Sequence, residues 1–177
     1  MVIVIPEGSD GHLSAAVRIA HNLLSYLRIA SIIVHDREAS HELGTGVYGC
    51  SNYVIMGGHR NEFGQAFLAS SPAPITFTKD GWTLQGRSFD SAGLGESKYL
   101  ARERGINETL GMAFLYRHPT CETGLSLFMD ATDDAGLERV LRLFPFRTGV
   151  MMPEWVITGP EADMLGAGGF LGAGYVK

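Results

Sequence analysis

The spacing of apolar positions changes along the chain between the period of a strand and that of a helix, which predicts an α/β fold. Residues 2–5 are apolar on both faces, as in a central parallel strand. Helical spacing follows over residues 12–28. The apolar face of this helix comprises Leu13, Ala16, Val17, Ala20, Leu24 and Leu27. Strands at 31–34 and 53–56 and a helix at about 62–70 complete a series with right-handed crossovers and a parallel sheet.

The second half of the chain begins with a hairpin pattern over residues 74–84, turning at Asp80-Gly81. The other elements expected are an exposed charged helix over 91–108, strands at 110–116 and 125–129, a helix capped by residues 130–134 that carries Leu137, Val140, Leu141 and Phe144, and a last strand at 155–158. The tail is too glycine-rich for a stable helix, and we expect it to pack over this domain or a neighbouring one. Exposed Met151, Met152, Trp155 and Phe170 would form a partner surface. We predict one three-layer, mostly parallel α/β domain over residues 1–177, flavodoxin-like or Rossmann-like, with a β-hairpin insertion.

Composition and charge narrow the possible partners. The 177 residues are 45% hydrophobic and carry a net charge of −5, so no basic field attracts nucleic acid. No apolar run approaches the roughly 20 residues that span a bilayer. The N-terminus lacks the basic segment of a signal peptide, which leaves the compartment open and a secreted parent protein compatible. A strand directly after Met1 suggests a domain cut from a longer protein.

The predicted topology locates a candidate ligand site. If the first strand lies between the second and third, a crevice opens at its carboxyl end. Four loops would meet there, at residues 7–12, 36–38, 57–61 and 130–134. The candidate crevice residues are Ser9, Asp10, Gly11, His12, Gly57, Gly58, His59 and Arg60. Topology gives this location but no chemistry.

The loop at residues 8–12 has two interpretations. Gly8 and Gly11 before a helix, with Asp36 ending the next strand, are compatible with dinucleotide binding. However, the spacing is not GxGxxG, and Asp10 would repel a pyrophosphate. We therefore favour a structural turn in which Ser9 or Asp10 caps the helix and Gly11 eases the turn.

The loop after residues 53–56 has a similar pair of interpretations. Arg60 and helix-terminal amides could hold a small anion beside His59. We favour a tight Gly57-Gly58 turn followed by solvated first-turn residues, with Asn61 as a possible cap. No pair of histidines has zinc-ligand spacing with a third ligand nearby, and no cofactor or metal is expected.

Nucleophilic catalysis has only weak candidates. Three segments approach the GxSxG elbow, but each lacks the second glycine. Cys121 lies close to His118 in sequence, yet catalytic Cys–His pairs are built by the fold and not by sequence neighbours. Cys50 and Cys121 could pair, but we expect two free buried thiols. No complete catalytic constellation is visible.

The C-terminal half resembles a known family. Residues 136–150 (GLERVLRLFPFRTGV), 153–163 (PEWVITGPEAD) and 166–169 (GAGG) resemble the C-terminal region of large fungal proteins described as α/β-hydrolases of the prolyl-oligopeptidase, or serine peptidase, type. Shorter similar stretches are residues 18–24, 56–58 and 118–120. In that family the catalytic Ser, Asp and His belong to a separate upstream domain, so no catalytic residue carries over.

Three functions follow as hypotheses. The first is a noncatalytic accessory domain that packs on, or gates, the upstream hydrolase module of the same polypeptide. The second is a small-molecule binding module that uses the crevice. The third is a free-standing cysteine hydrolase, which would require an unusually acidic thiol at Cys121 or Cys50.

Overall fold

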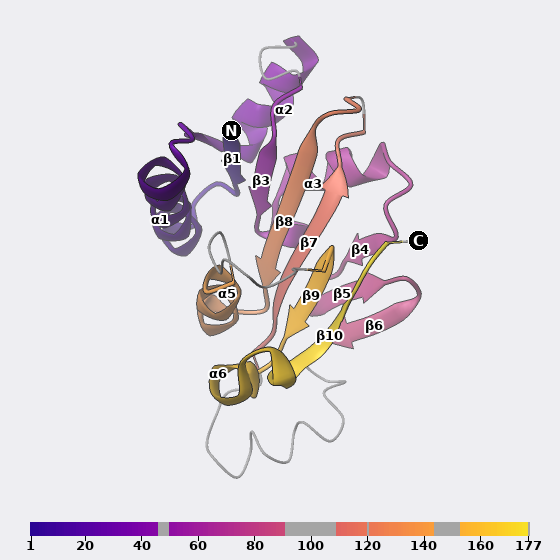
Figure 1. Cartoon of the computed structure of the whole chain (residues 1–177). Coiled ribbons are helices and arrows are strands. Elements are labelled where there is room, and N and C mark those ends of the chain that lie inside the picture. Colours follow the sequence, from indigo (N-terminus) through magenta and orange to yellow (C-terminus); the bar gives the residue numbers. More distant parts are fainter. Residues whose placement is uncertain (46–49, 91–108, 120, 144–152, 177) are drawn as a thin grey trace. The chain divides into compact units, whose positions relative to one another are not determined.

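The structure is a computed structural model (Figure 1). It divides into two compact units. It describes the chain apart from residues 46–49, 91–108, 120, 144–152 and 177. The first unit comprises residues 1–73 and 115–129, and the second comprises residues 74–114 and 130–177. The single domain expected over residues 1–177 stays a prediction.

A seven-stranded, mostly parallel sheet flanked by helices confirms the predicted three-layer α/β architecture. The strand order is β10-β9-β7-β8-β3-β1-β2. These strands are β1 (Val2–Ile5), β2 (Ile32–His35), β3 (Tyr53–Met56), β7 (Gly111–Arg117), β8 (Leu125–Ala131), β9 (Trp155–Thr158) and β10 (Phe170–Gly174). The pairs β1–β2, β1–β3 and β3–β8 are parallel, whereas β9 is antiparallel to both β7 and β10.

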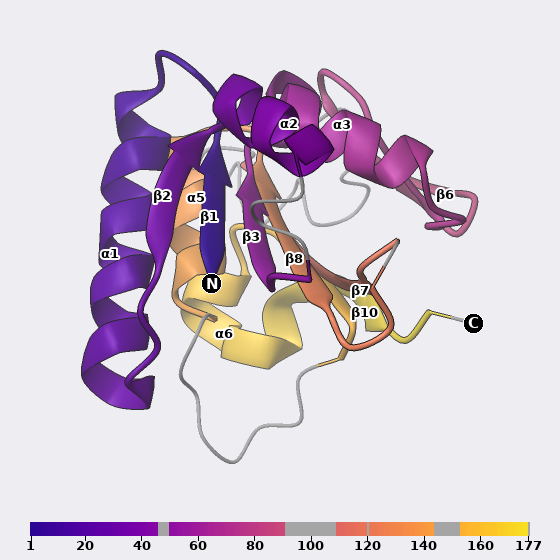
Figure 2. The same ribbon diagram turned by 90° about the horizontal axis from the view of Figure 1, so that it is seen from above.

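The first unit is built around β1, which lies between β2 and β3 as the sequence predicts. All four residues of β1 are buried, which explains why this strand is apolar on both faces. Three helices flank the strands: α1 (Asp10–Leu27), α2 (Asp36–Thr45) and α3 (Glu62–Ala69). Helix α1 packs on one face of β1 and β2, and α2 and α3 pack together on the other (Figure 2).

Two expectations for these helices were wrong. The face that α1 buries is Ala15, Ala16, Ile19 and Leu23, so only Ala16 of the predicted apolar face is buried. The helix carries two apolar stripes, and periodicity alone does not identify the inner one. Helix α2 was not predicted, because its ten residues are mostly polar and give no apolar repeat.

The second unit contains a separate antiparallel sheet in the order β4-β5-β6. The predicted hairpin is confirmed as β4 (Ile75–Phe77) and β5 (Gly81–Leu84), and β6 (Arg87–Asp90) adds a third strand. The β5–β6 connection is a two-residue turn in which Gln85 has φ 50° and Gly86 has φ 78°. This left-handed pair is typical of type I′ hairpins, but Gln-Gly is not among the strongest sequence signals for them.

The C-terminal segment differs from the prediction, because β9 is not the last strand. Two short helices, α6 (Ala162–Leu165) and η2 (Gly166–Gly169), lead into β10. A Cβ at Gly172 or Gly174 would lie 3.0 Å from the Trp155 ring, so glycine lets β10 pass against this indole. The predicted capping of the preceding helix is confirmed, since Asp133 accepts a hydrogen bond from Gly136 N (2.8 Å) at the start of α5 (Asp134–Leu141).

Some predictions fall outside the described residues. They concern the charged helix over 91–108, Phe144, and the exposed surface that included Met151 and Met152. Trp155 and Phe170 of that surface are described and are partly buried.

Candidate functional site

Two of the loops predicted to border the crevice follow β1 and β3, whose carboxyl ends are adjacent in the first unit. Because the chain leaves β1 through α1 toward β2 and then returns over β1 to β3, the two connecting helices lie on opposite faces. This arrangement is the topological switch point at which α/β sheets commonly bind ligands. Residues 130–134, predicted as a fourth loop, belong to the second unit and run from the end of β8 to the start of α5. Asp130 accepts a hydrogen bond there from Trp82 Nε1 (2.8 Å).

The β1–α1 loop joins a serine to a histidine. Ser9 is the N-cap residue of α1 and has extended backbone geometry, but its side chain makes no capping bond. Its Oγ instead lies 2.6 Å from Nδ1 of His12, and the pair is partly buried. The glycine that serves the turn is Gly8, with φ 70°, and not Gly11 as predicted. Gly11 lies within α1.

The β3–α3 loop approaches this pair through Gly57. The residue is buried with φ 90°, and a Cβ there would lie 2.7 Å from Pro6 Cγ and 3.4 Å from His12 Nε2. The positive φ and the close approach to Pro6 therefore favour glycine here, and the backbone passes near the His12 ring. Gly58 is also buried and begins the short helix η1 (Gly58–Arg60), in which His59 and Arg60 are exposed, as expected.

Two buried polar residues form the framework of the crevice. The Asn61 amide donates to Met56 O (2.8 Å) and accepts from Gly64 N (2.8 Å), which confirms the predicted cap of α3. Asp36, 3% exposed, accepts hydrogen bonds from Glu62 N (2.9 Å) and Arg37 N (3.1 Å). Its carboxylate thus orders the start of α3, and this differs from the ribose-binding role considered for it.

The electrostatics of the crevice are mixed. Glu7 pairs with Arg37 at 3.0 Å on the surface, while Asp10 and Arg60 are exposed near the two loops. The Ser9–His12 pair offers a hydroxyl and an imidazole for hydrogen bonding to a polar ligand. The described part of the chain contains no group of three or more His, Cys, Asp or Glu residues arranged to bind a metal ion.

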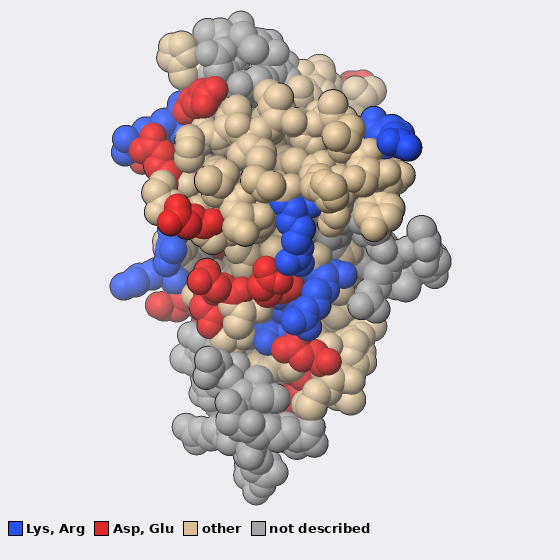
Figure 3. All heavy atoms as spheres, turned by 90° about the vertical axis from the view of Figure 1, so that its left-hand side faces the viewer, with Lys and Arg blue, Asp and Glu red and all other residues tan. Residues whose placement is uncertain are grey.

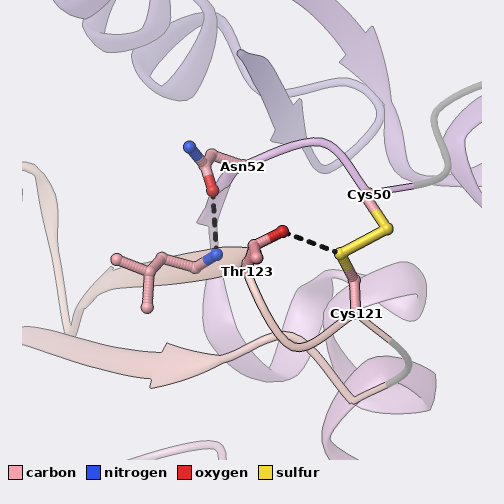
Figure 4. The surroundings of a disulfide bond; sticks show 5 residues. Cys50, Asn52, Cys121 and Thr123 are labelled. Atoms are coloured by element: carbon pink, nitrogen blue, oxygen red, sulfur yellow. Dashed lines mark hydrogen bonds between the residues drawn. A yellow bond between two sulfur atoms is a disulfide. The ribbon is translucent and has the colours of Figure 1, made fainter.

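The two cysteines form a disulfide, so the expectation of free thiols was wrong. Cys50 precedes β3, Cys121 lies in the β7–β8 connection, and their Cα atoms are 5.4 Å apart (Figure 4). Next to the bond, Asn52 Oδ1 accepts from Leu125 N (2.8 Å). A sequence separation of 71 residues hides this pairing from any local motif.

His118 is buried among aromatic side chains. Its side chain is 4% exposed and packs between the rings of Tyr53 (5.6 Å) and Phe67 (5.2 Å). Burial lowers the pKa of His118 from its ordinary value of 6.5. His118 does not form a catalytic pair with a Cys121 thiolate, because the sulfur of Cys121 is bonded to Cys50.

The sequence predicted the two loops of this candidate site but not their polar contacts. The strand order and the two loops were predicted, whereas the Ser9–His12 hydrogen bond and the role of Asp36 were not. A serine three residues before a histidine at a helix start is the only local signal for the first. Comparison of the chain with protein-family models and with curated protein sequences finds no match. Among the described residues, no helix combines the length and apolar character needed to cross a membrane.

Proposed function

We propose that this chain is a noncatalytic accessory domain that packs on, or gates, a serine hydrolase module of the prolyl-oligopeptidase type. The resemblance of residues 136–150, 153–163 and 166–169 supplies the kind of partner. The observation that carries the proposal is the disulfide, which leaves no thiol nucleophile at Cys50 or Cys121. Since His118 is enclosed by aromatic rings, a role through protein contact fits these residues better than a role through chemistry.

We also propose a flavodoxin-like fold for part of the seven-stranded sheet. The order β2-β1-β3-β8 corresponds to the first four positions of the flavodoxin-like order 2-1-3-4-5. We infer a flavodoxin-like outline for this part of the sheet, with β4–β6 as the inserted sheet.

We infer that α6 makes the contact with the hydrolase module, because this helix joins two of the segments that carry the resemblance, 153–163 and 166–169. Met164 and Leu165 are 46% and 61% exposed on this four-residue helix. Glycines follow in η2, and Gly169 lies so close to the backbone of Glu161 and Ala162 that no Cβ fits. This tight turn holds two adjacent apolar side chains at the surface, as a docking contact requires.

The first test is enzymatic. The oxidised chain, assayed alone against ester and peptide model substrates beside an active serine hydrolase, should show no turnover. Turnover by the oxidised chain would refute the proposal. Turnover that appears only after reduction and disappears in Cys121→Ala would favour the cysteine hydrolase instead.

The second test concerns the contact. The chain should melt at a higher temperature when it is linked to the hydrolase module of a parent protein than when it is alone. Leu165→Asp should remove most of this gain, whereas Leu125→Asp, at a leucine 49% exposed on β8, should preserve it. Equal effects of the two variants would contradict docking through α6.

A second candidate function is small-molecule binding at the crevice, favoured by the Ser9–His12 hydrogen bond beside Gly57. A panel of nucleotides, sugars and carboxylates, screened by melting shift, would test it. A shift that is lost in His12→Ala and retained in Ser14→Ala, at an exposed serine of the same helix, supports binding. No shift with any member would count against it.

A further inference from the structure

Helix α1 exposes an apolar stripe that its own unit does not cover. Leu13, Val17, Leu24 and Leu27 are 43%, 54%, 53% and 50% exposed, and Ala20 lies between them. The spacing of these five residues alternates between four and three, which is the seam of a coiled coil. We call these residues the outer stripe.

Charge is sparse over the whole of this helix. Its 18 residues contain only two charged side chains, Asp10 in the first turn and Arg18. Figure 3 looks onto the side of the chain where α1 lies and shows a broad surface with few charged residues there. A solvent-facing helix is ordinarily polar on its outer side, so this surface is typical of an interface.

The neighbouring edge of the sheet is open as well. β2 is the end strand among the described strands, and α1 packs beside it. Ile32 is 48% exposed, and the strand contains neither lysine nor proline. Natural proteins often protect free edges with such residues, so this short edge is open to a partner.

We propose that the outer stripe is a self-association surface that joins two copies of this chain through an antiparallel pair of α1 helices. This surface belongs to the first unit and does not depend on the hydrolase contact proposed for α6 in the second. The small Ala20 lies at the centre of the stripe and permits close approach. An antiparallel pair then sets Leu13 and Val17 of each copy against Leu24 and Leu27 of the other.

Charge selects the antiparallel orientation. A parallel pair would place Asp10 against Asp10 and Arg18 against Arg18, and it would align the helix dipoles unfavourably. In the antiparallel pair, Asp10 lies near the exposed Arg28 that ends the other helix. The surface is thus complementary to itself in both apolar pattern and charge.

The size of the contact sets the expected affinity. A helix of 18 residues is about 27 Å long, so one helix pair is a small interface. Interfaces at this end of the range are weak, and we expect a dissociation constant on the order of 10 µM.

Sedimentation velocity of the oxidised chain across this concentration range tests the proposal. The wild type should pass from monomer to dimer, and Leu24→Glu should raise the dissociation constant about 100-fold, because a buried unpaired charge is costly. Ser25→Glu adds the same charge at the next, exposed position and should leave association nearly unchanged. Circular dichroism confirms that each variant is folded. A wild type that stays monomeric at every concentration, or a dimer indifferent to Leu24→Glu, would overturn the proposal.

A charge exchange tests the orientation. Asp10→Lys and Arg28→Asp should each weaken association several-fold, and the double variant should recover most of the loss. Loss that is additive in the double variant would overturn the antiparallel arrangement. Absence of turnover is measured separately, so failure of this inference and failure of the accessory role are distinguishable.

Discussion

Each unit contains a cross-link between distant segments, and two of these links differ in chemistry. In the first unit the disulfide Cys50–Cys121 ties the start of β3 to the β7–β8 connection. In the second, the buried Arg139 of α5 donates to Thr109 O (2.9 Å) and to Asp163 of α6 (2.8 Å). A covalent link depends on the redox environment, whereas an ionic link depends on the fit of its partners.

The disulfide suggests where such a chain folds. Disulfides persist in oxidising compartments and are rare in the cytosol. An oxidising compartment would therefore preserve this bond, and the sequence alone did not indicate one.

The largest expected effect comes from breaking the covalent link. Replacing both cysteines by alanine should lower the free energy of unfolding by about 4 kcal/mol, because the bond closes a loop with a sequence separation of 71. Guanidinium unfolding with and without dithiothreitol measures this change. The double variant should ignore the reductant, and a wild type equally indifferent to it would show that the bond does not contribute.

Breaking the ionic link should have the next largest effect. Arg139→Met removes the partner of Thr109 O and one of the two arginines that contact Asp163, and should cost about 3 kcal/mol. Arg142→Met removes the other arginine, whose side chain is 57% exposed, and should change stability by less than about 1 kcal/mol. Urea unfolding of the two variants compares them directly. Equal losses of stability in the two variants would mean that burial does not distinguish the two arginines. As a control, dithiothreitol should destabilise both variants as much as it destabilises the wild type.

The same contrast between local and distant constraints explains what the sequence could predict. The β1 strand was predictable because four β-branched or apolar residues in a row need cover on both faces. The hairpin of β4 and β5 was predictable from its local turn residues, although the turn is centred on Lys79-Asp80 and Gly81 begins β5. By contrast, β10 was missed because its glycines are needed only for contact with Trp155, a partner that no local pattern names.

The candidate site divides in the same way. Its location follows from strand order, and the Asn61 cap follows from residue type and position. The disulfide joins residues 71 apart, and the Asp36 carboxylate accepts a hydrogen bond from a residue 26 positions away. Sequence spacing does not reveal either contact. In α1 both stripes have helical spacing, so only the packed sheet shows which one is buried.

The smallest expected effect is a pH dependence of stability that comes from His118 in the first unit. Burial lowers the pKa of His118 in the folded state, so the unfolded chain takes up this proton first as the pH falls below 6.5. The first unit should therefore have its full stability above pH 6.5 and lose up to about 1.4 kcal/mol per pH unit below it, until folded His118 also protonates. His118→Gln should flatten this dependence, whereas His41→Gln, at an exposed histidine on α2, should retain it. Unfolding free energies at pH 7.5, 6.5 and 5.5 provide the comparison, and an unchanged slope in His118→Gln would assign the loss of stability in acid to other groups.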